Sequence, residues 1–139
     1  MATSPEPRIP GRASILLVED ADFFRARLRN VIARHGLGRT VETGSGREAI
    51  ALYRSGRFGL VLLDVVLPDL DGLEVLRTLR RDDPEAKVLV ITAAATRFVV
   101  ERAWRSGAAG VLGKPVEEGR LCRSITRALA GARGPGPGE

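Results

Sequence analysis

Short aliphatic runs alternate five times with longer amphipathic stretches along the middle of this chain, and this alternation restricts its fold most strongly. The five runs predict strands over residues 14–18, 40–43, 60–63, 87–91 and 110–112. Three of the runs are aliphatic throughout, as expected for strands that helices cover on both faces. Five strand and helix pairs in succession favour a parallel sheet with right-handed crossovers, so the predicted fold class is α/β and doubly wound.

The segments between the runs have apolar residues at helical spacing and polar residues typical of helix ends. Ser45 and Glu48 form the sequence pattern of a capping box for a helix that runs through Tyr53. Asp71 precedes a helix with leucines three residues apart, and Gly36 ends the first helix. A fourth helix is expected from about residue 96 to residue 105, and a fifth before residue 130.

The chain has 139 residues, 44% of them apolar, which suits one domain with a single core. We expect this domain to cover residues 14–130, between mobile tails at residues 1–13 and 131–139 that are rich in Pro, Gly and Arg. No apolar run reaches the roughly 18 to 20 residues that span a bilayer, and no signal peptide is visible, so we expect a cytoplasmic protein without membrane contact. The single cysteine, Cys122, and single histidine, His35, exclude an internal disulfide and a Cys/His zinc site; Cys122 is expected to be buried in the last helix.

The formal charge of +5 is concentrated near the chain ends, because residues 14–118 carry only +1 of it. This distribution and the 4% aromatic content argue against direct nucleic-acid binding by this domain. Arg120, Arg123 and Arg127 lie on the last helix opposite its apolar face. They have two interpretations: a solvated surface, or a docking stripe for an acidic partner or for a second copy of the chain in a homodimer.

Four of the five predicted strands end beside a polar group, and these groups define the candidate site. Glu19 and Asp20 follow the first strand, Asp64 the third, Thr92 the fourth and Lys114 the fifth. Each alone is typical of a helix cap, but the carboxyl ends of parallel strands meet at one edge of the sheet.

Convergence of these groups has a chemical consequence. Two carboxylates about 4 Å apart repel by roughly 4 kcal/mol at an effective dielectric constant near 20, so the group needs a cation. Oxygen ligands suit Mg²⁺, while a lysine and a hydroxyl suit phosphoryl oxygens. The pattern therefore predicts metal-assisted phosphoryl transfer onto a carboxylate.

Glycine-rich nucleotide sites fit this sequence poorly. The turn after the first strand reads EDAD, which would repel a phosphate in the absence of a metal ion. The GSG segment at residues 44–46 is better interpreted as a turn into the capped second helix.

Four segments, in order and at matching spacing, resemble the receiver domains of two-component response regulators. They read ILLVED, LVLLDVVLPDLDG, VLVITA and GVLGKP, and the resemblance covers nearly all of residues 14–130. It implies a flavodoxin-like (βα)5 fold with strand order 2-1-3-4-5. It also implies a cis peptide bond between Lys114 and Pro115.

The resemblance implies a role for each acidic residue of the site. Asp64 would accept a phosphoryl group from a phosphohistidine of a sensor histidine kinase or a histidine phosphotransfer protein. Asp20, Asp64 and the backbone carbonyl of Val66 would bind Mg²⁺. Glu19, where Asp is commoner in the family, would bind the ion directly or through water.

The remaining implied roles concern the phosphate and the output. Lys114 would pair with Asp64 before transfer and with the phosphate afterwards, and Thr92 and the backbone N–H of Ala93 would bond phosphate oxygens. The implied function is a switch that passes its signal to a downstream effector protein or a fused output domain, and not an enzyme. The loop residues that resemble the family's are expected to serve as turn and cap residues: Pro68, Asp69, Asp71 and Gly72.

Two departures from the family pattern lead to further hypotheses. Val111 stands where many receivers carry Tyr or Phe, which motivates an alternative function as a receiver-like interaction module that does not use phosphate. In the resembling family, two positions face the water that attacks the phosphoryl group; here they are Val66 and Ala94, neither of which can hydrogen-bond that water, so slow self-dephosphorylation is predicted. A haloacid-dehalogenase-like phosphatase is a third alternative, but that family requires a second Asp where Val66 stands.

Overall fold

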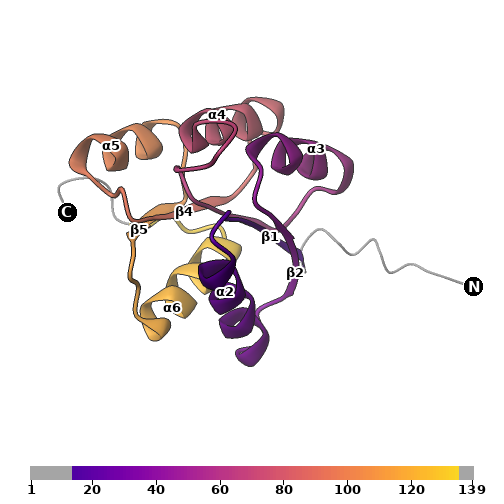
Figure 1. Ribbon diagram of the computed structural model, residues 1–139, viewed down its shortest axis with the longest axis vertical. Helices are drawn as coiled ribbons and strands as arrows, with labels where there is room; N and C mark the ends of the chain where they lie inside the picture. The colour runs from indigo at the N-terminus through magenta and orange to yellow at the C-terminus, as the bar shows by residue number, and fades with distance from the viewer. Residues whose placement is uncertain (1–13, 135–139) are drawn as a thin grey trace, which may run out of the picture.

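The computed structural model describes residues 14–134, which form a five-stranded parallel sheet between two layers of helices (Figure 1). The strands are β1 (Ser14–Val18), β2 (Arg39–Thr43), β3 (Leu60–Leu63), β4 (Val88–Thr92) and β5 (Gly110–Gly113). Their order is β2-β1-β3-β4-β5, and every neighbouring pair is parallel. Both the doubly wound α/β class and the order 2-1-3-4-5 are confirmed.

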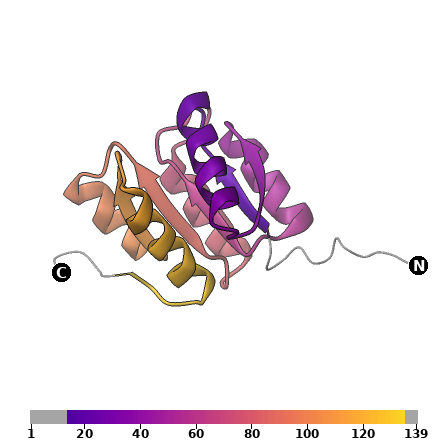
Figure 2. The same cartoon turned by 90° about the horizontal axis from the view of Figure 1, so that it is seen from below.

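Helices cover both faces of the sheet, as the aliphatic strands require. Figures 1 and 2 show α2 (Asp22–Arg34) and α6 (Glu118–Leu129) on one face. The opposite face carries α3 (Gly46–Gly56), α4 (Gly72–Asp82) and α5 (Arg97–Arg105). Across residues 14–134, no helix combines the length and apolar character needed to cross a membrane.

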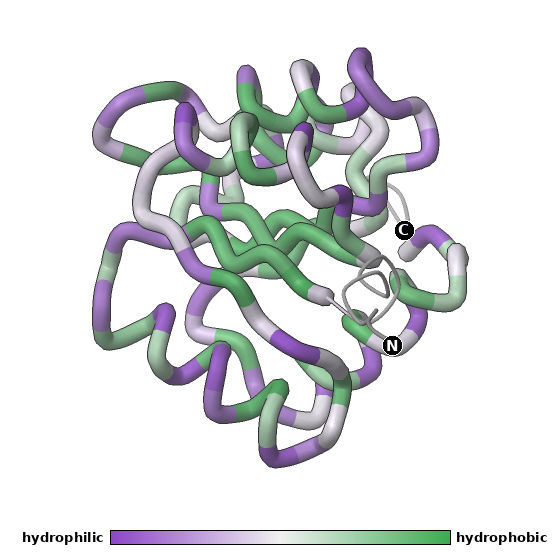
Figure 3. The backbone as a smooth tube through the Cα atoms, turned by 90° about the vertical axis from the view of Figure 1, so that its right-hand side faces the viewer, coloured by the Kyte–Doolittle hydropathy of each residue, from purple (hydrophilic) through white to green (hydrophobic). Residues whose placement is uncertain are grey.

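The core consists of two apolar layers because successive strand side chains point to opposite faces. Figure 3 shows these strands as a hydrophobic centre with polar segments on the outer turns of the helices. In β1 and β3, Ile15, Leu17, Leu60 and Leu62 pack with the apolar stripes of α2 and α6. The alternate residues of the same strands pack beneath α3, α4 and α5: Leu16, Val18, Val61 and Leu63. A fully buried aliphatic side chain stabilises the fold by about 1.5–3 kcal/mol, so both layers hold the strand ends in place.

Polar caps begin the helices where the sequence predicts them. The Ser45 hydroxyl accepts a hydrogen bond from the Glu48 N–H at 3.1 Å, and the Asp71 carboxylate accepts one from the Leu73 N–H at 2.9 Å. The reciprocal half of the capping box is not formed, because the Glu48 carboxylate accepts from the Thr43 hydroxyl instead. The expected turn at residues 44–46 is confirmed, since Ser45 is the N-cap of α3.

Several boundaries differ from the sequence predictions. β2 starts one residue earlier, β5 ends one residue later, and β4 is shifted so that Thr92 is its last residue and does not follow it. Cys122 is half-buried on α6, where burial had been expected.

The chain beyond α6 also differs from the expected mobile tail, because residues 131–134 pack on the domain. The Gly134 N–H donates to the Ala109 carbonyl at 2.7 Å, and the Arg133 guanidinium stacks 3.6 Å from the centre of the Trp104 ring. The expected tails over residues 1–13 and 135–139 lie outside the described residues.

Candidate functional site

The polar groups predicted at the strand ends lie along the carboxyl edge of the sheet. Glu19 directly follows β1, Asp64 follows β3 and Lys114 follows β5, while Thr92 ends β4. β1, β3, β4 and β5 are successive neighbours in the sheet, so their ends are adjacent in space. Glu19, Asp64 and Thr92 are buried polar residues, with exposed fractions of 2%, 6% and 0%.

Lys114 joins the two buried carboxylates. Its Nζ donates to Glu19 Oε1 at 2.7 Å and to Asp64 Oδ2 at 3.0 Å. The second oxygen of Asp64 accepts from the Val66 N–H at 3.0 Å, and the second oxygen of Glu19 accepts from the Ala21 N–H at 3.1 Å. Every carboxylate oxygen of the pair therefore has a donor, as buried charges require.

The electrostatics follow from burial and from this pairing. Burial raises the pKa of the Glu19 carboxyl above its ordinary value, although the bonds from Lys114 and Ala21 oppose the shift. Burial alone would lower the pKa of Lys114, but its hydrogen bonds to Glu19 and Asp64 outweigh that effect and raise it. Lys114 is thus held as a cation against Asp64, the residue predicted to accept the phosphoryl group.

Thr92 is fully buried and offers a donor that the fold leaves unused. Its Oγ1 accepts a hydrogen bond from the Ala94 N–H at 3.2 Å. Within residues 14–134 its hydroxyl donates to no acceptor. A buried hydroxyl donor without an acceptor is costly, and an incoming phosphoryl oxygen would satisfy it. Ala93, whose N–H was also predicted to bond the phosphate, is exposed beside it.

The sequence predicts that the clustered carboxylates need a metal ion to balance their charge, and in the structure Lys114 supplies part of that balance. Lys114 neutralises part of the charge of Glu19 and Asp64, whereas Asp20 is exposed and forms no side-chain bond within the described residues. In residues 14–134, no group of three or more His, Cys, Asp and Glu side chains is arranged to hold a metal. The three carboxylates and one lysine still leave an excess of negative charge, and their oxygen donors fit Mg²⁺, which needs only one or two carboxylates.

The loop between β3 and α4 is held by two features. Gly72 approaches the chain so closely that a Cβ there would lie 2.3 Å from Val65 Cα and 2.5 Å from the Asp64 carbonyl oxygen. The second feature is Asp69, predicted only as a turn residue. Its carboxylate accepts from the Ser45 hydroxyl and from the N–H groups of Gly46 and Arg47, at 2.8–3.0 Å.

Those bonds have an electrostatic consequence. The N–H groups of Arg47 and Gly46, followed by the smaller effect of the Ser45 hydroxyl, lower the pKa of Asp69 to about 2. Asp69 therefore attaches the loop after the predicted phosphoacceptor to the positive end of α3. A local pattern such as PDLDG suggests a turn and cannot indicate a cap on a different helix.

Two further residues at the site were not predicted to act there. Lys114 Nζ lies 4.2 Å from the centre of the Phe24 ring, a cation–π contact that helps to orient it. The Arg25 guanidinium donates to the Glu19 carbonyl at 2.6 Å. The Lys114–Pro115 peptide bond is cis, which confirms the sequence prediction.

The two side chains predicted to face the attacking water differ in exposure. Val66 is 59% exposed, and Ala94 is half-buried. Val111 packs against the core layer beneath α3, α4 and α5. Away from the site, Arg120, Arg123 and Arg127 are all exposed on α6, which leaves both interpretations of this stripe open.

Comparisons with known proteins agree with this architecture. A family model described as the response regulator receiver domain matches residues 15–126. The polar-differentiation response regulator DivK of Brucella anthropi is 33% identical over 121 residues, 86% of this chain and 98% of that protein. The crystal structure of a LuxR-family two-component response regulator from Aurantimonas sp. SI85-9A1 has a TM-score of 0.83 and 32% identity, covering 90% of each chain. The CheX-CheY-BeF3-Mg complex from Borrelia burgdorferi, at 23% identity, shares the fold with a TM-score of 0.78 over 84% of this chain and 88% of that chain.

Proposed function

This chain belongs to the response regulator receiver domain family, the phosphorylatable receivers of two-component signalling, and from that premise we propose that Asp64 is its phosphoacceptor. One observation carries the proposal: a buried carboxylate at the carboxyl edge of the sheet is held 3.0 Å from the ammonium of Lys114. Lys114 holds a positive charge beside the attacking oxygens of Asp64 and can afterwards bond a phosphoryl oxygen.

The transfer is a substitution at phosphorus. An oxygen of Asp64 forms the new O–P bond while the P–N bond of a phosphohistidine on a sensor histidine kinase or histidine phosphotransfer protein breaks. The electron pair of the broken bond stays on the donor nitrogen, and the imidazole leaves neutral when its other nitrogen carries a proton. The buried Thr92 hydroxyl gains an acceptor on the transferred group, as does the exposed N–H of Ala93.

Asp20 and Asp64, with the backbone carbonyl of Val66, would hold Mg²⁺, and Glu19 would contact it directly or through water. When bound, the ion neutralises charge on the phosphoryl oxygens. Asp20 supports this assignment because it is exposed and has no side-chain partner within residues 14–134. Lys114 donates hydrogen bonds to the other two carboxylates, Glu19 and Asp64.

Phosphorylation adds about −2 charge at this edge of the sheet and biases a two-state equilibrium that a downstream effector or output domain reads. We propose that the protein is a switch whose only reaction of its own is slow self-dephosphorylation. Val111 lacks the ring that reports activation in many family members, so the readout depends on movement of Thr92 and its loop. A receiver-like interaction module that does not use phosphate is the competing function, and the experiment below separates the two.

The test is intact-mass measurement after incubation with Mg²⁺ and a small phosphodonor. We expect the wild type to gain the mass of one phosphoryl group, and Asp64→Asn to gain none. Asp82→Asn is the matched control, because Asp82 is an aspartate at the end of α4 paired only with Arg54. An Asp64→Asn protein that still gains the group, or a wild type that gains nothing while folded, would contradict the assignment.

A further inference from the structure

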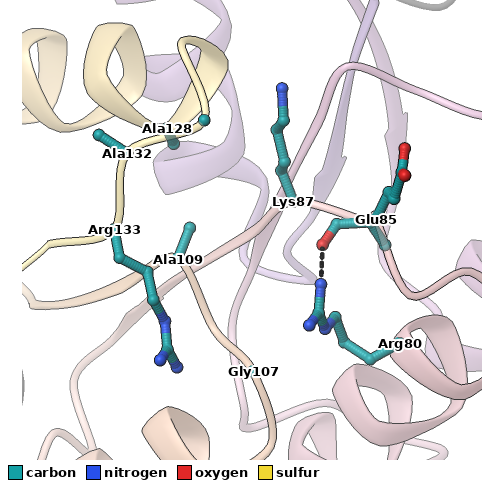
Figure 4. A pocket seen from close by; sticks show the side chains of 10 residues that line it. Arg80, Glu85, Lys87, Gly107, Ala109, Ala128, Ala132 and Arg133 are labelled. Carbon is teal, nitrogen blue, oxygen red and sulfur yellow. Dashed lines mark hydrogen bonds between the residues drawn. The ribbon is translucent and has the colours of Figure 1, made fainter.

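A cavity of about 240 Å³ lies at the edge of the sheet opposite to the predicted phosphorylation site (Figure 4). Its walls come from the chain just before β4 and β5 and from the segments that follow α4, α5 and α6. Residues 131–133, which belong to the segment that packs back on the domain, supply one side. Nothing in the proposed phosphoryl transfer uses this region.

The lining is strongly basic. It includes the side chains of Arg80, Lys87 and Arg133, against a single carboxylate, Glu85, so the walls carry two net positive charges. Within residues 14–134 none of the three cations forms an ion pair, and neither does Glu85. Basic side chains elsewhere in the structure repeatedly have carboxylate partners, such as the Arg25 and Arg29 pairs with Glu42.

Main-chain carbonyls hold the three cations in place. Arg80 Nη1 donates to the carbonyls of Pro84 and Ala86 at 2.6 and 3.0 Å, and Figure 4 shows Arg80 bonded to a carbonyl of the lining. Lys87 Nζ donates to the Leu129 carbonyl at 3.1 Å.

Arg133 is held in the same way. Its Nε and Nη2 donate to the carbonyls of Ala108 and Trp104, at 3.0 and 2.6 Å. A guanidinium has five N–H donors, so each arginine retains donors that the fold does not use. Burial and, to a smaller extent, the nearby charge of Arg80 lower the pKa of Arg133.

We propose that this cavity binds a small anion of the phosphate class. Two arginines and a lysine with free donors match the oxygens of a phosphate, and the anion would offset the repulsion between the cations. The cavity is smaller than the roughly 300–1,000 Å³ typical of sites for drug-sized ligands, so its occupant is a compact anion such as inorganic phosphate or a small phosphate ester. The competing explanation is that the basic side chains only cap backbone carbonyls at the ends of α5 and α6 and in the loop after α4.

The only tryptophan of the chain provides a direct probe, because Trp104 stacks on Arg133 beside the cavity. We would titrate the unphosphorylated protein without Mg²⁺, using inorganic phosphate, glycerol 3-phosphate or chloride at constant ionic strength, and follow Trp104 fluorescence. A saturable change with phosphate or its ester, absent with chloride, is expected. Tighter binding of inorganic phosphate or of glycerol 3-phosphate shows whether the ligand is free phosphate or a phosphate ester.

Variants separate binding from simple helix capping. Lys87→Gln and Arg80→Gln keep the Trp104–Arg133 stack and should weaken binding about tenfold or more, since each removes a charged hydrogen-bond donor. Arg123→Gln on the exposed side of α6 is the matched control and should bind like the wild type. If Arg80→Gln does not fold, Lys87→Gln decides the question.

Backbone amide NMR locates the anion independently. Shifts concentrated at Gly107 and Gly131, which line the cavity, are expected. Shifts confined to residues 64–66 and 92–94, a response equal to that of chloride, or unchanged affinity in Lys87→Gln would overturn the proposal and leave the basic side chains as helix caps.

Discussion

Replacing Lys114 with methionine removes the cation that bridges the two buried carboxylates of the site. The side chains of Glu19 and Asp64 are 3% and 7% exposed, and that of Lys114 is 16% exposed. Methionine preserves most of the apolar stem but offers no donor. Both carboxylates then remain buried with one hydrogen-bond donor fewer each.

Breaking a buried ion pair by removing one partner costs about 3–5 kcal/mol of folding free energy. Because Lys114 is partly solvated, the lower end of that range applies. We expect Lys114→Met to lower the free energy of unfolding by about 3 kcal/mol at pH 7.5. Removing a second charge should restore stability. The double variant Glu19→Gln/Lys114→Met is expected to recover at least about 1 kcal/mol, because the two residues are in direct contact.

The loss should shrink at lower pH. Burial of the Glu19 carboxyl, whose folded pKa is raised, destabilises the protein while that group is ionised; the penalty shrinks as the pH falls through the folded pKa and is gone below the ordinary value of 4.5. The raised pKa of Lys114 in the wild type has the opposite sign: its contribution is fully present below the unfolded pKa and is lost only as alkaline pH rises through the folded pKa. Between pH 7.5 and the ordinary carboxyl value of 4.5, the change therefore comes from Glu19.

The assay is urea unfolding followed by Trp104 fluorescence at both pH values. Lys87→Met is the control, because Lys87 is the other lysine of the chain and bonds only a carbonyl, so its loss should be about 1 kcal/mol and independent of pH. A Lys114→Met deficit no larger than that of Lys87→Met, or one unchanged between the two pH values, would refute the role assigned to the bridge.

Three further predictions concern the site and its loop. The wild type should lose its phosphoryl group slowly by hydrolysis. Under saturating Mg²⁺, Val66→Asn and Ala94→Glu should each speed this loss about 10- to 100-fold, because the new side chain can orient the attacking water. Equal rates of loss in the variants and the wild type would argue against this. Gly72→Ala should lower the free energy of unfolding in urea by about 1–3 kcal/mol, because its Cβ meets backbone atoms, whereas Gly56→Ala, with its nearest atom at 3.9 Å, should not destabilise the protein. The carboxyl of Asp69 should titrate by NMR near pH 2, and a pKa near the ordinary value of 3.8 would be inconsistent with the loop contacts. Its contribution to stability is present above pH 3.8 and is lost as the pH falls through 2. Asp69→Asn should therefore lower the urea midpoint at neutral pH but not below pH 2.

Much of the fold was predictable because its signals are local. The aliphatic runs, the caps at Ser45 and Asp71, and the polar residues at the strand ends are patterns within a few residues of one another. The exact ends of the strands were less predictable. Thr92 pairs with Gly113 and so extends β4, although a polar residue after an aliphatic run usually indicates that the strand has ended.

The contacts within the site depend on distances that sequence spacing does not encode. The Lys114–Glu19 bond joins residues 95 positions apart, and the Lys114–Asp64 bond joins residues 50 apart. The sequence placed these groups at one edge of the sheet, but only the packed structure decides that Lys114 bridges both carboxylates and so supplies part of the charge expected of a metal. The close contact with the Phe24 ring is decided in the same way.

The sequence by itself thus determined the element order, the sheet edge that carries the chemistry and the residue types found there, because hydrophobic period and strand-end polarity act over short stretches of chain. Tertiary structure alone decided that Asp69 caps a helix more than 20 residues earlier, and that Arg133 returns to Trp104 and closes a basic cavity. Those contacts form because the two helical layers bring distant segments together around the core. Side-chain acceptors such as the Asp69 carboxylate and donors such as the Arg133 guanidinium then satisfy backbone groups that the sequence leaves unassigned.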